Sequence, residues 1–184
     1  MNRKILCIAL YLLSIVAANV LTASYMPIQL GSLLIPAGSF LIGATFVFRD
    51  LVQNAVGRRL TYATIAVAMI VSAASSSMLG DTLWIVAASA IAFLFSETTD
   101  TEIYTRLRLP MTYKVLYSGI FGGAVDSVIF VIVGLSPLGA GFLPWDLVGY
   151  AIAGQIVAKI AMQALAAIVL RALPNRMIDS RAAA

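Results

Sequence analysis

The chain has 184 residues, of which 61% are hydrophobic and 11% charged, with a net charge of +4. Soluble domains carry about 25% charged residues, so this composition excludes a soluble globular protein, and its apolar content also excludes intrinsic disorder. The single cysteine, Cys7, excludes an intrachain disulfide framework and CxxC metal sites. The lack of histidine excludes Ser–His hydrolases and histidine-based zinc proteases.

The first two predicted helices share a run of 44 residues, 5–48, that contains no Asp, Glu, Lys or Arg. As one helix this run would be about 66 Å long, twice the bilayer's hydrocarbon core of roughly 30 Å, so it must hold two crossings. Pro27, Gly31 and Pro36 mark the turn between them. Four further apolar segments follow. The sequence therefore predicts an all-α bundle of six transmembrane helices at about 5–25, 37–57, 60–79, 82–104, 117–135 and 147–170.

The fourth helix is the unusual one. Only fifteen residues separate Asp81 from Glu97, which gives about 22 Å of helix, less than the hydrocarbon core. To cross the membrane, this helix must continue through Glu97 and Asp100 to about Tyr104. Its acidic residues are therefore expected partly inside the membrane.

Lys and Arg residues alternate along the predicted loops. They occur before the first helix, in the second and fourth loops and in the tail, whereas the first, third and fifth loops contain none. The ten residues are Arg3, Lys4, Arg58, Arg59, Arg106, Arg108, Lys114, Arg171, Arg176 and Arg181. By the positive-inside rule, this pattern predicts a multi-pass protein of the cytoplasmic (inner) membrane with both termini in the cytoplasm. It also explains the net charge without a nucleic-acid partner.

The chain is expected to form a single transmembrane domain over residues 1–184. An alternative concerns the N-terminus, where Arg3-Lys4, an apolar stretch and Thr22-Ala23-Ser24 loosely resemble a signal peptide. Its removal would leave five helices and break the alternation of charge.

Six charged residues remain inside the predicted helices: Arg49, Asp50, Glu97, Asp100, Asp126 and Lys159. Each costs about 2.5–3.5 kcal/mol at a helix centre, so they should face one another or water. Spacing from the loop charges places Arg49, Glu97, Asp126 and Lys159 roughly 13–18 Å from the cytoplasmic boundary. The charges of four helices are therefore expected in one layer near the middle of the membrane.

Two interpretations of this layer are open. The charges could form structural ion pairs, such as Arg49 with Glu97 and Lys159 with Asp126. They could instead line a polar cavity that receives a solute, a proton or both. Four acids against two bases leave an acidic excess, which a purely structural network would avoid because unpaired buried charge is expensive. The excess favours the cavity.

Amides share helix faces with these charges. Asp50, Gln53 and Asn54 lie on one face of helix two, and Gln155, Lys159 and Gln163 lie on one face of helix six, while Asn19 is the only strong amide of helix one. Converging amides and carboxylates suit a solute rich in N–H and C=O groups, such as a purine-like heterocycle. Interhelical hydrogen bonding, worth about 0.6 kcal/mol for each bond, is the alternative and is preferred for Gln163.

Several motifs together resemble the queuosine-precursor transporter family, also called the vitamin-uptake-transporter-like family. The resemblance rests on these segments: Ala18-Asn19, Phe48-Arg49-Asp50-Leu51, the acidic block 96–108, the aspartate motif 121–130 around Asp126, and Lys159. It implies uptake of a deazaguanine precursor of queuosine. It also implies a bundle similar to the substrate-binding subunits of energy-coupling-factor vitamin transporters.

By position, the residues that carry over from the family are Asn19, Asp50, Asp100, Asp126 and Lys159. The chain departs from the family in two places. Arg49 stands where a small polar residue is usual, and Gln53-Asn54 occupies a stretch where many members have an acid.

The sequence thus predicts a transporter, not an enzyme, with no cofactor or metal and with the lipid bilayer and a purine-like solute as partners. The expected substrate-binding residues are Asn19, Arg49, Asp50, Gln53, Glu97, Asp100, Asp126 and Lys159. A non-transporting scaffold or accessory subunit with structural ion pairs is the alternative. An intramembrane aspartyl protease is disfavoured because Leu79-Gly80-Asp81 lacks the first glycine of a GxGD motif. The energy source and any energising partner stay open.

Overall fold

The computed structural model describes residues 3–172; Arg176 and Arg181, which were counted above for orientation, lie outside the described residues. Six α-helices, one short hairpin and one π-helical turn make up this part of the chain. They are α1 (Arg3–Ser24), β1 (Ile28–Leu30), β2 (Leu33–Ile35), α2 (Gly38–Val56), α3 (Arg58–Met78), α4 (Leu83–Arg106), α5 (Met111–Ile129), the π-helical turn η1 (Phe130–Leu135) and α6 (Trp145–Ala172).

Each predicted helix corresponds to one observed helix, and α4 does continue through Glu97 and Asp100. Among the described residues, five segments are long and apolar enough to cross a membrane: α1, α3, α4, α5 with η1, and α6. Helix α2 is not among them, because polar residues such as Arg49, Asp50 and Gln53 lower its hydropathy.

One predicted boundary is wrong by about two turns. Helix five was expected to begin near Tyr117, but α5 begins at Met111, directly after Pro110. The expectation followed the apolar segment alone. A helix continues past the apolar segment wherever its backbone hydrogen bonds can form, and proline is well tolerated at a helix start because its missing N–H has no partner there.

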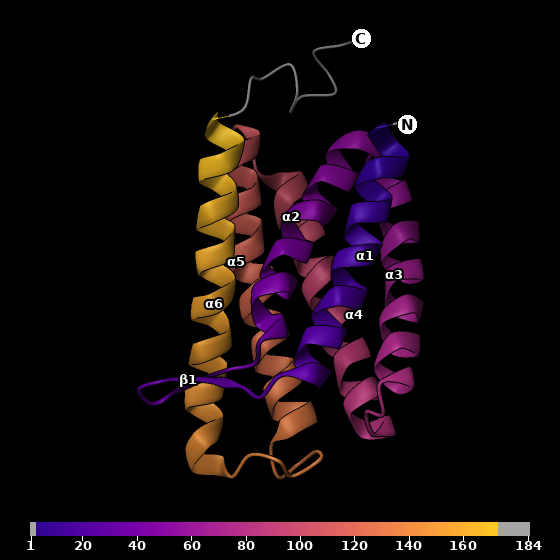
Figure 1. Ribbon diagram of the computed structural model, residues 1–184. Helices are drawn as coiled ribbons and strands as arrows, with labels where there is room; N and C mark the ends of the chain where they lie inside the picture. Colours follow the sequence, from indigo (N-terminus) through magenta and orange to yellow (C-terminus); the bar gives the residue numbers. More distant parts are fainter. Residues whose placement is uncertain (1–2, 173–184) are drawn as a thin grey trace.

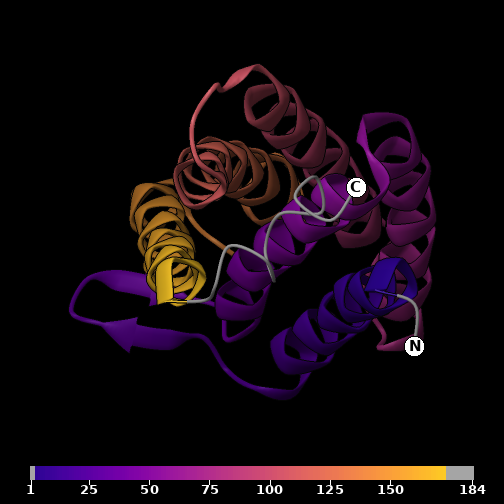
Figure 2. The same cartoon turned by 90° about the horizontal axis from the view of Figure 1, so that it is seen from above.

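Helix α2 lies at the centre of the bundle. It contacts all five other helices, and the view along the bundle shows it running between α1 on one side and α4, α5 and α6 on the other (Figure 2). Gly43 allows its close approach to α6: a Cβ there would lie 2.7 Å from Met162 Cβ and 3.2 Å from Lys159 Cα. The helix that carries the buried residues Arg49 and Asp50 is therefore in contact with every other helix of the bundle.

The glycines of α5 also serve packing within the bundle. A Cβ on Gly122 would lie 2.8 Å from Asp100 Cβ in α4, and one on Gly123 would lie 3.3 Å from Lys159 Cβ in α6. Together with Gly119, which gives residues 119–123 a GxxxG spacing, these glycines bring α5 close to both neighbours, as is common for helices in membranes.

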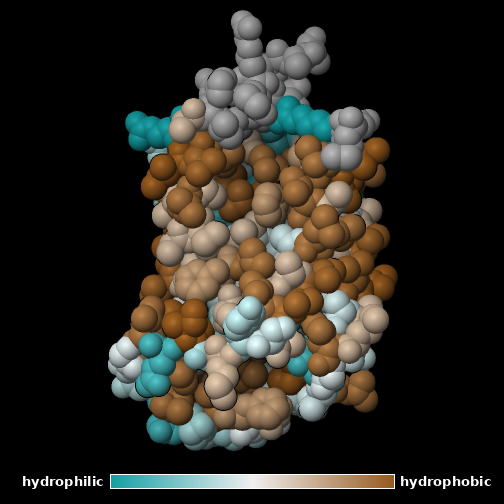
Figure 3. Space-filling view, viewed as in Figure 1, coloured by the Kyte–Doolittle hydropathy of each residue, from teal (hydrophilic) through white to brown (hydrophobic). Residues whose placement is uncertain are grey.

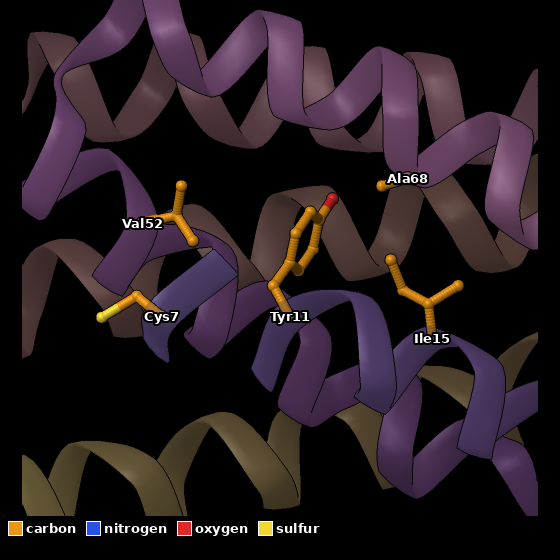
Figure 4. Packing of buried hydrophobic residues seen from close by; sticks show 5 residues of the cluster. All are labelled: Cys7, Tyr11, Ile15, Val52 and Ala68. Atoms are coloured by element: carbon orange, nitrogen blue, oxygen red, sulfur yellow. The ribbon is translucent and has the colours of Figure 1, made fainter. Parts of the chain in front are cut away.

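Apolar packing dominates the side of the bundle formed by α1, α2 and α3. Tyr11 and Ile15 of α1 pack with Val52 of α2 and Ala68 of α3, with Cys7 at the edge of the cluster (Figure 4). The Tyr11 side chain is fully buried between these helices.

A short antiparallel hairpin that the sequence did not predict connects α1 to α2. Leu30 pairs with Leu33, and Gly31, with φ 61°, makes the turn. The hairpin lies beside α6, where a Cβ on Gly154 would stand 2.6 Å from the carbonyl oxygen of Leu34 (Figure 1). The glycine in α6 therefore makes room for the hairpin backbone.

A single residue joins α2 to α3. Gly57 ends one helix and begins the next, with φ 81° and ψ 164°, a conformation essentially restricted to glycine. This junction lies at the end of the bundle where α1 begins and α6 ends, whereas the hairpin and the loop after η1 lie at the other end (Figure 1).

The outer surface matches a membrane protein. A broad hydrophobic band separates two ends that carry hydrophilic side chains (Figure 3). Large apolar residues that face outward in this protein include Leu13, Ile70 and Ile168, each at least 65% exposed. Lipid is the medium in which such a surface is stable.

Candidate functional site

A cavity of about 380 Å³ opens in the half of the bundle that is remote from the start of α1. All six helices contribute a polar residue to its lining: Asn19, Thr45, Ser72, Ser89, Asp126 and Gln155. Aromatic rings of Tyr25, Phe93, Phe130 and Phe142 form part of its wall. An apolar and aromatic wall with a few converging polar groups, at this volume, is typical of a small-molecule site.

Asp126 and Lys159 form an ion pair beside this cavity. Lys159 Nζ lies 2.7 Å from Asp126 Oδ2, 2.7 Å from Ser127 Oγ and 3.2 Å from Gln155 Oε1. These three bonds use all three hydrogens of the ammonium group. Lys159 is 1% exposed and does not line the cavity, so it fixes the groups around it rather than presenting its own charge.

Gln155 is oriented by that lysine. Because an ammonium group only donates, Gln155 must turn Oε1 toward Lys159, which leaves its NH2 group for another partner. Gln155 Nε2 is buried and donates to no atom of residues 3–172, although the side chain lines the cavity. A buried donor without a partner costs about 1–3 kcal/mol, so this amide is suited to receive an acceptor from a solute.

Asp126 supplies the matching acceptor. It is 8% exposed, and its Oδ1 lies 3.4 Å from Ser96 Oγ. Of the charged residues in the described part of the chain, only Asp81 and Asp126 line the cavity. Asp81, in the loop between α3 and α4, accepts a short hydrogen bond from Ser76. The cavity therefore carries acidic groups and no basic group on its own surface.

Asn19 connects the cavity wall to α3. Its Nδ2 donates to the Ser72 carbonyl oxygen at 3.1 Å and to Ser75 Oγ at 2.7 Å. Both N–H groups of the amide are thereby used, and its carbonyl oxygen is the group that remains to accept a hydrogen bond.

A second group of polar side chains lies closer to the start of α1 and is buried away from both the cavity and the protein surface. Arg49 Nη2 lies 2.9 Å from Asp50 Oδ1 and forms an ion pair with Asp100, while Nε lies 3.3 Å from Glu97 Oε2. Arg49 Nη1 donates to Gln53 Oε1 at 2.8 Å. We refer to Arg49, Asp50, Glu97 and Asp100 as the ion cluster; their side chains are at most 1% exposed.

The structure thus divides the eight predicted site residues. Asn19 and Asp126 line the cavity, Lys159 lies directly behind Asp126, and the remaining five lie in or against the ion cluster. Both ion pairs that the sequence offered as an alternative, Arg49 with Glu97 and Lys159 with Asp126, are present. Whether any of these residues binds a solute stays a prediction.

Two features of the site were missed from the sequence. Gln155 was not among the predicted site residues, although its spacing of four from Lys159 placed it on the same helix face. The serine and threonine hydroxyl groups of the cavity were also missed, because single serines and threonines in apolar helices give no periodic signal. They belong to Thr22, Ser39, Thr45, Ser72, Ser76 and Ser89.

No cluster of His, Cys, Asp and Glu among residues 3–172 has the arrangement of a metal site. In the ion cluster the carboxyl groups face the guanidinium of Arg49.

Comparison with known proteins gives one match. The sequence profile of the family described as "Putative vitamin uptake transporter" matches residues 72–173, which begin within the last third of α3, cover α4, α5 and α6, and include Glu97, Asp100, Asp126 and Lys159. No curated protein and no solved structure matches the chain. The match covers more than half of the sequence, and its helices are those of a multi-pass membrane protein. The chain therefore belongs to the vitamin uptake transporter family.

Proposed function

We propose that the protein imports a purine-like solute, a deazaguanine precursor of queuosine, across the cytoplasmic membrane. The observation that carries this proposal is the cavity, to which all six helices contribute polar groups and whose wall holds an acceptor, Asp126, and a donor, Gln155. Membership of the vitamin uptake transporter family supports transport as the activity.

The chemistry of the cavity fits the edge of a guanine-type ring. Such an edge presents a ring N–H beside a C=O group, so it needs one acceptor and one donor on the protein. Asp126 would accept from the N–H, and Gln155 Nε2 would donate to the C=O. The rings of Phe93 and Phe130 offer flat apolar surface for the heterocycle.

Further predicted residues take roles around this pair. The carbonyl oxygen of Asn19 would accept a second N–H group, and Lys159 would position Asp126 and Gln155. The other predicted site residues could contact the solute only in a second conformation, in which the cavity reaches the ion cluster. These residues are Arg49, Asp50, Gln53, Glu97 and Asp100.

We propose six membrane spans with both termini in the cytoplasm. The cavity is lined by the loop residues Tyr25, Asp81 and Phe142, which lie in the three loops that contain no Lys or Arg. In this orientation the cavity faces outward, and the ion cluster closes the path to the cytoplasm. A central site with one side open and the other closed is what alternating access requires.

Uptake by cells that cannot make their own queuosine precursor tests the proposal. Cells that express the protein should accumulate a radiolabelled deazaguanine precursor and regain queuosine in their tRNA, and cells with an empty vector should not. The Asp146→Asn variant is the control, because Asp146 is exposed at the start of α6 and does not line the cavity. Absence of uptake with normal protein in the membrane would contradict transport. Solute binding without uptake would indicate an accessory subunit instead.

A further inference from the structure

The ion cluster contains more acid than base. One guanidinium, from Arg49, faces the carboxyl groups of Asp50, Glu97 and Asp100. With all four groups ionised, the cluster would carry a net charge of −2. The nearby ammonium of Lys159 does not offset this charge, because it is paired with Asp126.

Burial makes this excess charge unstable. All four side chains of the ion cluster are at most 1% exposed, and the helix that carries Arg49 and Asp50 is enclosed by the other five. An uncompensated ion in a protein interior costs several kcal/mol even after relaxation. A buried group in this position takes up or releases a proton to become neutral. Two protons on the three carboxyl groups would make the cluster neutral.

The neighbours of the cluster supply few other donors. From α1, the Tyr11 hydroxyl faces Glu97; from α5, Ser118 Oγ lies 3.3 Å from Asp50 Oδ2. From α2 and α4, Gln53 and Thr101 serve as acceptors for Arg49. The charged groups that approach from α5 and α6 are Asp126 and Lys159, which pair with each other.

One carboxyl oxygen lacks a donor of its own. Asp100 Oδ1 is buried and meets the geometry of a hydrogen bond with no described residue, while Oδ2 of the same group pairs with Arg49. The Ser118 hydroxyl also interacts with Asp100, but its one hydrogen is directed to Asp50 Oδ2. An ionised carboxylate with an unsatisfied buried oxygen is unfavourable, and protonation of that oxygen removes the uncompensated negative charge. This oxygen is the natural position for a proton.

We infer that the ion cluster is a proton-binding site that couples uptake to a proton gradient. In the conformation described here two of the three carboxyl groups hold protons, the third is ionised and paired with Arg49, and all are sealed from water. When the bundle rearranges to face the cytoplasm, water reaches the cluster, and one protonated carboxyl group transfers its proton to water and becomes a second carboxylate facing Arg49. The transport step of this inference rests on the proposed function, whereas proton binding itself does not.

A short path links the cluster to the cavity. Ser96, fully buried and adjacent to Glu97, lies 3.4 Å from the cavity residue Asp126 through its hydroxyl group. Gly122 of α5 packs on the same segment, since a Cβ there would lie 3.2 Å from the Ser96 carbonyl oxygen and 2.8 Å from Asp100 Cβ. A solute that forms a hydrogen bond with Asp126 would therefore affect the segment of α4 that carries Glu97 and Asp100.

Infrared spectroscopy of the purified protein tests proton binding without any solute. The wild type in lipid vesicles at pH 7, where exposed carboxyl groups are ionised, should show the C=O band of protonated carboxyl groups. Asp100→Asn and Glu97→Gln should each reduce this band by about half, because a neutralised acid leaves one proton to be held in place of two. Asp146→Asn, an exposed acid, is the matched control and should leave the band unchanged. A wild type without the band, or variants that all keep it in full, would overturn the inference.

Transport in the same vesicles tests the coupling. With a radiolabelled deazaguanine precursor, an acidic exterior should accelerate uptake by the wild type, and uptake should acidify the interior, as reported by a trapped pH dye. Asp100→Asn should weaken both responses, because its cluster holds one proton in place of two. If wild-type uptake does not depend on the proton gradient, the inferred coupling is wrong, while the transport function is unaffected. A vesicle preparation with the infrared band but no uptake would instead contradict the proposed function alone.

Discussion

Lys159 Nζ lies 2.7 Å from both Asp126 Oδ2 and Ser127 Oγ, so one ammonium group from α6 holds two consecutive residues of α5. Asp126 is thereby both a partner in a buried ion pair and a wall residue of the cavity. The proposed solute site and the buried ion pair therefore share this residue, and the variants below are chosen to separate the two effects.

Replacement of Asp126 by asparagine should abolish uptake. The change preserves size but removes the carboxylate, which leaves Lys159 with an unpaired buried charge and the solute N–H without a charged acceptor. Uptake of the labelled precursor and the amount of protein in the membrane are measured together, and insertion should be normal. The double variant Asp126→Asn/Lys159→Met should regain stability but not uptake. Full uptake by Asp126→Asn would contradict the site.

Replacement of Gln155 by methionine should weaken binding of the solute. Loss of one neutral hydrogen bond, about 0.5–1.5 kcal/mol, corresponds to a rise of about 2- to 12-fold in the KM for uptake. Gln163→Met is the matched control on the same helix face, because Gln163 Nε2 donates to the Gly43 carbonyl oxygen at 2.9 Å and lies outside the cavity lining. It should lower thermal stability and leave the KM unchanged. Equal effects of the two changes on the KM would argue against Gln155 as a donor to the solute.

Replacement of Arg49 by methionine should destabilise the protein by about 3–5 kcal/mol, as expected when one partner of a buried ion pair is removed. Thermal unfolding in detergent measures the effect, which should shrink at acidic pH because protons neutralise the remaining acids. Arg49→Lys should restore only part of the stability, since three nitrogens of the planar guanidinium reach different partners and an ammonium group cannot reproduce that geometry. Full stability of Arg49→Lys would show that charge alone is required.

Substitution of alanine at Gly122 should overpack the contact between α4 and α5. The added methyl group would lie 2.8 Å from Asp100 Cβ and 3.2 Å from the Ser96 carbonyl oxygen, at a cost of about 1–3 kcal/mol. Gly149→Ala in α6 provides the comparison, because nothing lies within 4 Å of a Cβ at that position. Thermal unfolding should separate the two variants, with the first less stable and the second close to the wild type.

Cysteine labelling should establish the orientation. Cys7→Ser gives a background without cysteine, into which Ser32→Cys, in the exposed hairpin, and Leu109→Cys, in the exposed loop before α5, are introduced separately. A membrane-impermeant maleimide added to intact cells should label position 32 at once and position 109 only after the membrane is opened. The reverse order would contradict cytoplasmic termini.

The sequence predicted the helices well because each depends on local composition. The apolar segments, the alternating loop charges and the short distance from Asp81 to Glu97 were sufficient for six helices and for the continuation of α4 through its acids. The hairpin after α1 could not be predicted in this way. Its strands have three residues each, and they lie against Gly154, which is distant in the sequence.

The candidate site was only partly predictable for the same reason. Charges in apolar helices are conspicuous, so both Arg49 with Glu97 and Lys159 with Asp126 could be proposed as pairs. Which of these groups lines the cavity depends on how six helices are rotated about their axes. The sequence alone placed the charges of four helices in one layer, but it did not distinguish Asp126, which lines the cavity, from the buried ion cluster around Arg49.

The single-residue junction at Gly57 makes the attachment of α2 asymmetric. One end of this central helix is tied to α3 by one glycine, while the other end is joined to α1 through residues 25–37, which include the hairpin. If α2 rotated about Gly57, each of its residues would move in proportion to its distance from that glycine. Arg49, about two turns away, would move less than Thr45 and Ser39 in the cavity wall. Such a rotation would change the width of the cavity while displacing the buried charges less.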